Sequence, residues 1–79
     1  MVTIFTSNSC ASCHLVVDAL RRSPIADVQI RNIDTDPAAR TMFDQSPGPR
    51  AVPKAVTGLS AIVGADSILR LLRATYGRP

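Results

Sequence analysis

The first third of the chain has the pattern of a strand followed by a helix. Residues 2–6 are mostly β-branched and aromatic, which suits a buried strand. Residues 7–9 are serines and an asparagine, typical of turns and N-caps, so a helix is expected to begin at about Cys10. The helical pattern stops near Arg22–Ser23–Pro24, and its apolar positions are Leu15, Val16, Ala19 and Leu20.

The middle of the chain repeats that order with a strand and a shorter helix. The strand is expected to end or kink near Asn32, and its apolar residues are Val28, Ile30 and Ile33. Asp36–Pro37 predicts a helix start, because aspartate caps helices and proline suits the first helical position. Residues 46–49 end this helix, since two prolines and a glycine cannot continue it. The side chains expected to point inward from it are Ala39, Met42 and Phe43.

The last third of the chain predicts a hairpin and a final helix. Two short runs, residues 54–57 and 61–63, are joined by Gly58–Leu59–Ser60 and indicate two antiparallel strands. A helix is expected to start around Asp66 and to be closed by Gly77 and Pro79. Its pattern runs through Ile68, Leu69, Leu72 and Tyr76, with Arg70 and Arg73 on the outer face.

The order of these elements predicts the topology. Strand–helix–strand implies a parallel pair joined by a right-handed crossover, and the closing hairpin adds antiparallel strands. We therefore expect one α/β domain over residues 1–79, with a four-stranded mixed sheet and helices on both faces. Cys10 would lie just beyond the carboxyl end of the first strand, where open α/β sheets place their sites.

Composition narrows the function. The net charge of +3 is spread along a chain with only three aromatic residues, whereas nucleic-acid binders cluster basic and aromatic side chains. The sequence begins without the basic and apolar regions of a signal peptide, and no apolar stretch approaches the ~20 residues that span a bilayer. We expect a cytoplasmic protein that binds neither nucleic acid nor membrane.

The motif Cys10–Ala11–Ser12–Cys13 carries the candidate chemistry. Two cysteines this close cannot form a disulfide framework, so a redox or metal-binding role is favoured. At a helix N-terminus, Cys10 would be stabilised as the nucleophilic thiolate. Cys13 lies one turn further on, where it could attack a mixed disulfide formed at Cys10. Both cysteines are therefore the candidate catalytic residues.

Other interpretations of the motif stay open at this stage. The two cysteines could be unrelated and pack as small apolar side chains. Alternatively, the domain could be an interaction module that keeps the fold but has no turnover. Together with His14 they match the C-x-x-C-H pattern of haem attachment, for which Met42 is the nearest plausible further ligand. Zinc needs four ligands, and the chain offers no second Cys or His cluster. A metal or iron–sulfur cluster shared across a dimer would use the thiolates of two chains.

The residues resemble the glutaredoxin branch of the thioredoxin-like family over nearly the whole chain. Residues 2–6 followed by the cysteine motif resemble its first strand and active-site loop, and Val52–Pro53 resembles its Val–Pro motif. The resemblance implies a βαβαββα fold and a cis proline that turns the Val52 backbone toward an extended peptide or glutathione. Residues 63–67 resemble the family's Gly–Gly–x–Asp–Asp segment. By that resemblance Gly64, Ala65 and Asp66 would hold the γ-glutamyl end of glutathione, although Asp66 could instead be a simple N-cap.

The resemblance also implies partners. Ala11 and Ser12 replace the usual proline and aromatic residue, and Val63 and Ser67 replace a glycine and an aspartate of the glutathione segment. The short chain is similar to the NrdH-redoxin type, which accepts electrons from thioredoxin reductase and donates them to ribonucleotide reductase, although the Trp–Ser–Gly–Phe–Arg–Pro–Asp segment is missing. We expect a monomeric dithiol electron carrier without a bound cofactor or metal, reduced by glutathione or by thioredoxin reductase with NADPH, that reduces protein disulfides.

Overall fold

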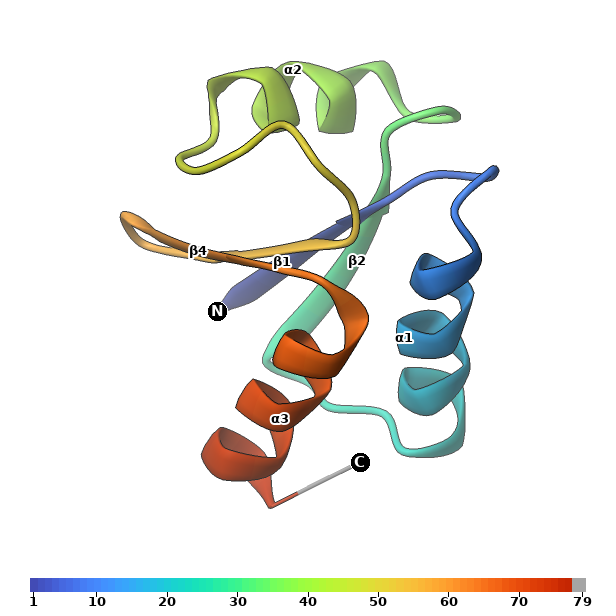
Figure 1. Ribbon diagram of the computed structural model, residues 1–79, viewed down its shortest axis with the longest axis vertical. Coiled ribbons are helices and arrows are strands. Elements are labelled where there is room, and N and C mark those ends of the chain that lie inside the picture. The colour runs from blue at the N-terminus through green and yellow to red at the C-terminus, as the bar shows by residue number, and fades with distance from the viewer. Residues whose placement is uncertain (78–79) are drawn as a thin grey trace.

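Four strands and three helices follow one another in the order that the sequence predicts (Figure 1). The structure is a computed structural model that describes residues 1–77, so the predicted role of Pro79 lies outside the described residues. The elements are β1 Val2–Thr6, α1 Ala11–Arg22, β2 Val28–Asn32, α2 Pro37–Gln45, β3 Lys54–Thr57, β4 Ser60–Val63 and α3 Ala65–Tyr76.

The strands form one mixed sheet in the order β2-β1-β3-β4. β1 is parallel to β2, with Val2 opposite Val28, and β3 is antiparallel to both β1 and β4. α1 and α3 lie together against one face of this sheet, and α2 lies on the opposite side (Figure 1). The predicted thioredoxin-like α/β architecture is therefore confirmed.

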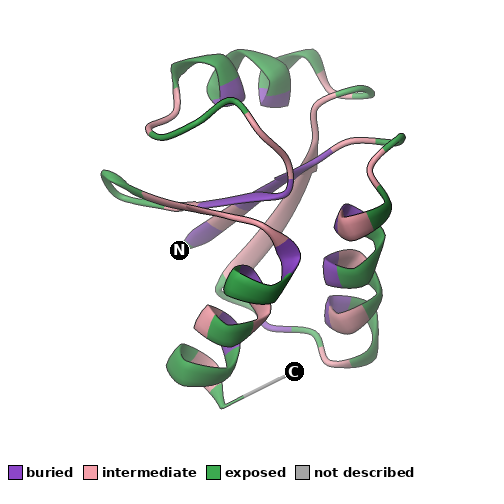
Figure 2. Ribbon diagram, viewed as in Figure 1, coloured by how far each residue is buried: buried purple, intermediate pink, exposed green. Residues whose placement is uncertain are grey.

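The main core lies between the sheet and the pair α1 and α3 (Figure 2). Because side chains alternate along a strand, Val2 and Ile4 of β1 point to this face. Ile4 lies opposite Ala55 of β3, and both are buried. The helices contribute Val16, Leu20, Ile68 and Leu72. This packing fixes α1 on the sheet and thereby fixes the position of the cysteine motif at its first turn.

The opposite face of the sheet holds a smaller aromatic cluster. Phe5 of β1 and Phe43 of α2 pack edge to face, with ring centroids 5.6 Å apart and planes at 65°. Lys54 lies opposite Phe5 in the sheet register and places its ammonium over the Phe43 ring. This cluster holds α2 and the following segment, residues 46–52, on the sheet.

Three details differ from the sequence expectations. Met42 is 41% exposed, because α2 turns Ala39 and Phe43, four residues apart, toward the sheet and leaves Met42 to one side. Leu15 is 58% exposed, because the buried stripe of α1 consists of Cys13, Val16 and Leu20. The expected pattern thus included one residue too many in each helix, beside Val16 and Leu20 in α1 and Ala39 and Phe43 in α2, which are buried as predicted.

The start of α3 is the third difference. The helix begins at Ala65, and its N-cap is Gly64, not Asp66. Gly64 has φ 101° and ψ 142°, a backbone conformation that glycine adopts without steric cost. Asp66 therefore lies in the first turn, where its negative charge still complements the helix dipole. The predicted close of the helix at Gly77 is confirmed, with this residue left-handed at φ 72°.

The cap of α2 is formed as predicted. Asp36 Oδ1 accepts hydrogen bonds from the N–H groups of Ala38 at 3.0 Å and Ala39 at 3.3 Å. Its other oxygen accepts one from the Arg31 guanidinium at 3.1 Å. The Ala39 hydrogen bond, together with the charge of Arg31, lowers the pKa of the Asp36 carboxyl below its usual 3.8.

This lowered pKa predicts an acid-dependent loss of stability. Since the folded state binds the Asp36 proton less tightly than the unfolded state, the stabilisation is present above about pH 4 and is lost as pH falls through the lowered pKa. Asp36→Asn keeps a capping oxygen without the charge. Urea unfolding between about pH 2 and 6 should show the wild-type advantage over this variant shrinking below about pH 4. A constant difference across that range would contradict the assignment.

Candidate redox-active site

The two cysteines lie at the start of α1, directly beyond β1, and are joined by a disulfide. Cys10 is the N-cap of the helix, and its sulfur accepts a hydrogen bond from the Cys13 N–H at 3.1 Å. Cys13 is fully buried on the inner side of the helix, whereas Cys10 is half-buried. Cys10 is therefore the sulfur that a substrate can reach first.

The Val52–Pro53 segment lies beside this disulfide. The Val52 carbonyl oxygen is 3.7 Å from Cys10 Sγ, and the peptide bond to Pro53 is cis, in agreement with the prediction. On the other side, Ser12 Oγ lies 3.6 Å from the same sulfur. The structure thus brings Cys10, Cys13, Val52 and Pro53 together, although they come from segments about forty residues apart in the sequence.

The predicted glutathione segment adjoins the site through its backbone. The Gly64 N–H donates to the Pro53 carbonyl at 3.0 Å, so this amide already has a partner within the fold. The Ala65 side chain is buried in the main core and offers no surface to a ligand. Asp66 is exposed in the first turn of α3. Of the three residues, Asp66 has the side chain that is free to face a ligand.

The remaining charged residues near the site have defined places. His14 is exposed on α1, and within residues 1–77 no group of three or more His, Cys, Asp or Glu side chains gathers as metal ligands. Arg40 and Arg50 both pair with Asp44, at 3.4 and 2.7 Å. Both ion pairs are exposed, and such surface pairs contribute little to stability.

Lys54 is the residue that sequence reasoning missed. It follows Pro53 directly and is fully buried, although its place in the sequence is equally compatible with an exposed strand residue. Burial, together with the nearby charge of Arg50, lowers the pKa of the Lys54 ammonium. Lys54 contacts the carbonyls of Pro47 and Pro49. These two prolines were the only signal in the sequence for its burial, but prolines by themselves do not indicate a buried cation.

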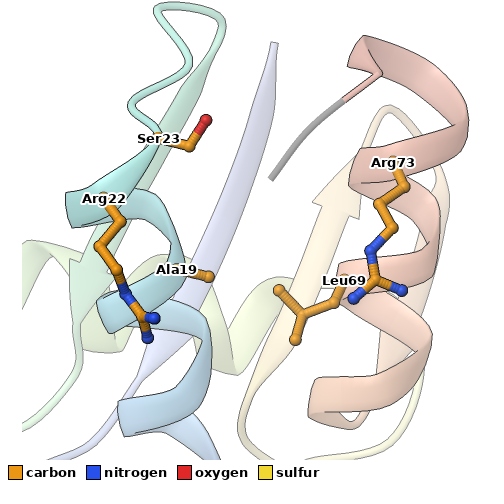
Figure 3. Close-up of a pocket in the computed structure, with 5 residues that line it drawn as sticks. All are labelled: Ala19, Arg22, Ser23, Leu69 and Arg73. Carbon is orange, nitrogen blue, oxygen red and sulfur yellow. The ribbon is translucent and has the colours of Figure 1, made fainter.

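A cavity of about 330 Å³ lies elsewhere, between α1 and α3 (Figure 3). It is lined by Arg22 of α1 and by Leu69 and Arg73 of α3, and the Leu69 side chain extends toward Ala19 of α1. Its nearest lining residue on α1, Ala19, is roughly 13 Å along the helix from Cys10 at 1.5 Å per residue. This cavity is therefore not part of the disulfide site.

Comparison with solved structures assigns the class of the fold. The chain is similar to the thioredoxin-like protein BC3987, known from a crystal structure of a mutant, with a TM-score of 0.62 and 20% identity. The match covers 91% of this chain and 99% of that chain. At this identity the likeness establishes a thioredoxin-like fold. Comparison with curated proteins gives no match.

The family follows from the sequence itself. Residues 2–58 match the family model described as Glutaredoxin, and the chain belongs to that family. The matched residues include the cysteine motif and Val52–Pro53, whereas Gly64, Ala65 and Asp66 lie beyond them. Family membership and the Cys10–Cys13 disulfide together support a thiol–disulfide oxidoreductase in general terms.

Proposed function

We propose that this protein is a dithiol electron carrier that reduces protein disulfides. The observation that carries the proposal is the division between the two sulfurs: Cys10 caps α1 at the surface, and Cys13 is buried one turn behind it. A surface sulfur suits attack on an external disulfide, and a buried sulfur within reach of it suits release of the product.

The reaction transfers two electrons in two exchange steps. The Cys10 thiolate attacks one sulfur of the substrate disulfide, forms a mixed disulfide and expels the first substrate thiolate, which takes up a proton. Cys13 then loses its proton and attacks Cys10 Sγ. The second substrate thiol leaves, and the Cys10–Cys13 disulfide of the present structure forms. An external thiol reductant must return two electrons to restore the dithiol.

The N-terminus of α1 activates Cys10 in this scheme. The Cys13 N–H points at Cys10 Sγ from 3.1 Å, and the positive end of the helix dipole acts on the same atom. We therefore expect the pKa of Cys10 in the dithiol form to lie below the free value of about 8.5. Titration of thiolate absorbance in the ultraviolet measures it. A value near about 8.5 would instead favour a non-catalytic interaction module.

The Val52 backbone is the proposed contact for substrate. Its carbonyl lies 3.7 Å from Cys10 Sγ, so an extended peptide aligned with residue 52 would bring its own sulfur to Cys10. We propose a disulfide-containing protein as substrate, with ribonucleotide reductase as a candidate. As the sequence predicts, we place this monomeric carrier in the cytoplasm. Within residues 1–77, no helix has the length and apolarity needed to cross a membrane.

A comparison of reductants tests the proposal. The protein is supplied with a peptide disulfide and NADPH, coupled either to glutathione and glutathione reductase or to thioredoxin reductase. We expect at least one system to drive turnover, and failure of both would refute the carrier function. The variant Asp66→Asn distinguishes the glutathione system from the thioredoxin reductase system, because Asp66 is the exposed side chain of the predicted glutathione segment. The variant should weaken the glutathione system and leave the thioredoxin reductase system unchanged.

A further inference from the structure

Lys54 is a buried cation, and no carboxylate in the described part of the chain forms an ion pair with it. Among residues 1–77, it is the charged residue whose side chain is buried, at 0% exposure. The nearby carboxylate on α2, Asp44, pairs with Arg40 and Arg50. Removal of the ammonium from water is unfavourable, as its lowered pKa reflects. Neutral groups must therefore hold this charge in place.

Three neutral groups surround the Lys54 ammonium. Nζ donates hydrogen bonds to the carbonyl oxygens of Pro47 at 3.1 Å and Pro49 at 2.9 Å. It also lies 4.6 Å from the centroid of the Phe43 ring, within the range of a cation–π contact. Two of the three N–H donors of the ammonium are thus hydrogen-bonded to carbonyl oxygens, and the aromatic ring adds an electrostatic contact.

Both hydrogen bonds end on the same loop, residues 46–52. Prolines have no N–H, so the backbone of Pro47 and Pro49 cannot donate in any regular structure. Between them, Gly48 has φ 82° and lies against β4, where an added Cβ would be 3.0 Å from Ala61 Cβ. The loop is thus held by close packing on one side and by the Lys54 ammonium on the other.

The same loop ends at the disulfide. Its last residue, Val52, places its carbonyl 3.7 Å from Cys10 Sγ, and Lys54 follows only two residues later. Lys54 consequently ties the middle of the loop to β3 at the point where the loop delivers Val52 to the site. Without the ammonium, the carbonyls of Pro47 and Pro49 would lose these hydrogen bonds. The Val52 carbonyl would then no longer be held at a fixed position beside Cys10 Sγ.

We propose that Lys54 is a positioning residue that holds the loop of residues 46–52 so that the Val52 backbone is fixed beside Cys10 for substrate. This inference rests on the proposed function, because it assigns the loop to the binding of the disulfide substrate. Lys54 itself does not touch the reacting sulfurs. Its effect is expected on substrate alignment and not on the reactivity of Cys10.

The test compares Lys54→Met with Arg50→Met. Both variants remove a cation near the Phe43 ring, but Arg50 is exposed and pairs with Asp44, so its loss leaves the loop carbonyls bonded. In Lys54→Met, we expect KM for a peptide disulfide to rise on the order of tenfold with little change in kcat. The alkylation rate of Cys10 by iodoacetamide, which does not need Val52, should stay within about twofold. Arg50→Met should resemble wild type in both assays.

A second readout does not depend on turnover. The loop is followed through amide hydrogen exchange of Gly64, whose N–H donates to the carbonyl of Pro53 directly after the loop. This loop exchange should accelerate about tenfold or more in Lys54→Met and remain unchanged in Arg50→Met. If Lys54→Met does not fold, Lys54→Gln, which keeps N–H donors without the charge, is measured in its place. If Lys54→Met is less stable but keeps the wild-type KM and loop exchange, the proposal is overturned. A change in the Cys10 alkylation rate as large as the change in KM would also overturn it, since Lys54 would then act on Cys10 itself.

The two hypotheses fail in different ways. If the wild-type protein shows no turnover with either reductant, the proposed function fails. In that case, loop exchange in Lys54→Met still tests whether Lys54 positions the loop, because this measurement does not require turnover. If the wild type is active and Lys54→Met retains its KM, the proposed function stands and the inference about Lys54 is wrong.

Discussion

Replacement of Cys10 by serine is expected to abolish reduction of protein disulfides, with a loss on the order of 10³-fold or more. Cys10 is the half-buried sulfur at the N-cap of α1, and Cys13 is fully buried behind it. A hydroxyl at residue 10 cannot form the mixed disulfide, and Cys13 has no path to an external substrate. The insulin disulfide, followed as turbidity with dithiothreitol as reductant, gives a direct assay.

Ser12→Ala is the matched control for this loss. Ser12 lies between the two cysteines, and its Oγ is 3.6 Å from Cys10 Sγ, yet it takes no part in the exchange. We expect its rate to stay within about fivefold of wild type, the effect of one weak hydrogen bond. Substantial activity in Cys10→Ser, or an equal loss in Ser12→Ala, would contradict the role given to Cys10.

The second large effect is expected on stability, at Leu72 of α3. This side chain is fully buried in the core that joins α3 to α1 and the sheet. Leu72→Ala should cost about 3 kcal/mol, because it removes apolar contacts and leaves a cavity. A domain of this size has a total stability of only about 4–12 kcal/mol. The variant should therefore melt roughly 12–24 °C below wild type.

Leu15→Ala is the same substitution in the other long helix, at a side chain that is 58% exposed. It should cost less than about 0.5 kcal/mol. Calorimetry or thermal denaturation followed by circular dichroism measures both variants. Equal losses at the two positions would show that the core is not where the structure places it. Because α3 packs against α1, Leu72→Ala should also lower activity at temperatures near its midpoint.

Much of this fold could be predicted because its signals are local. Asp36–Pro37 specifies the start of α2 by a cap and a preset backbone angle, and the cap forms as expected. The turn residues before Cys10 likewise place the cysteine motif at the start of α1. Once strand and helix alternate in this order, handedness and strand pairing restrict the topology to few choices.

The errors arose where tertiary packing decides. Leu15 and Met42 fit the apolar pattern of their helices, but the buried residues are Cys13, Val16 and Leu20 in α1 and the expected Ala39 and Phe43 in α2. A single helix cannot show which part of a broad apolar stripe faces the sheet, because that depends on its rotation against the other layers. The cap at Gly64 was missed because glycine lacks the side-chain oxygen by which N-caps are recognised.

The burial of Lys54 could not be predicted from its sequence neighbours. Lysine is almost never fully buried unless it is paired, and its partners here are carbonyl oxygens of the preceding loop and one aromatic ring. Those partners converge only when α2, the loop and β3 are assembled. The redox pair was found from spacing, whereas the residue proposed to position its substrate was visible only in the fold.

The central claim is that Cys10 and Cys13 exchange disulfides in that order, and Cys13→Ser tests it most directly. The reduced variant is mixed with a peptide disulfide, and the product is analysed by mass spectrometry without reductant. The account predicts accumulation of one peptide attached through Cys10, because the resolving sulfur is absent. Full turnover of the peptide by this variant, or no adduct at Cys10, would contradict it.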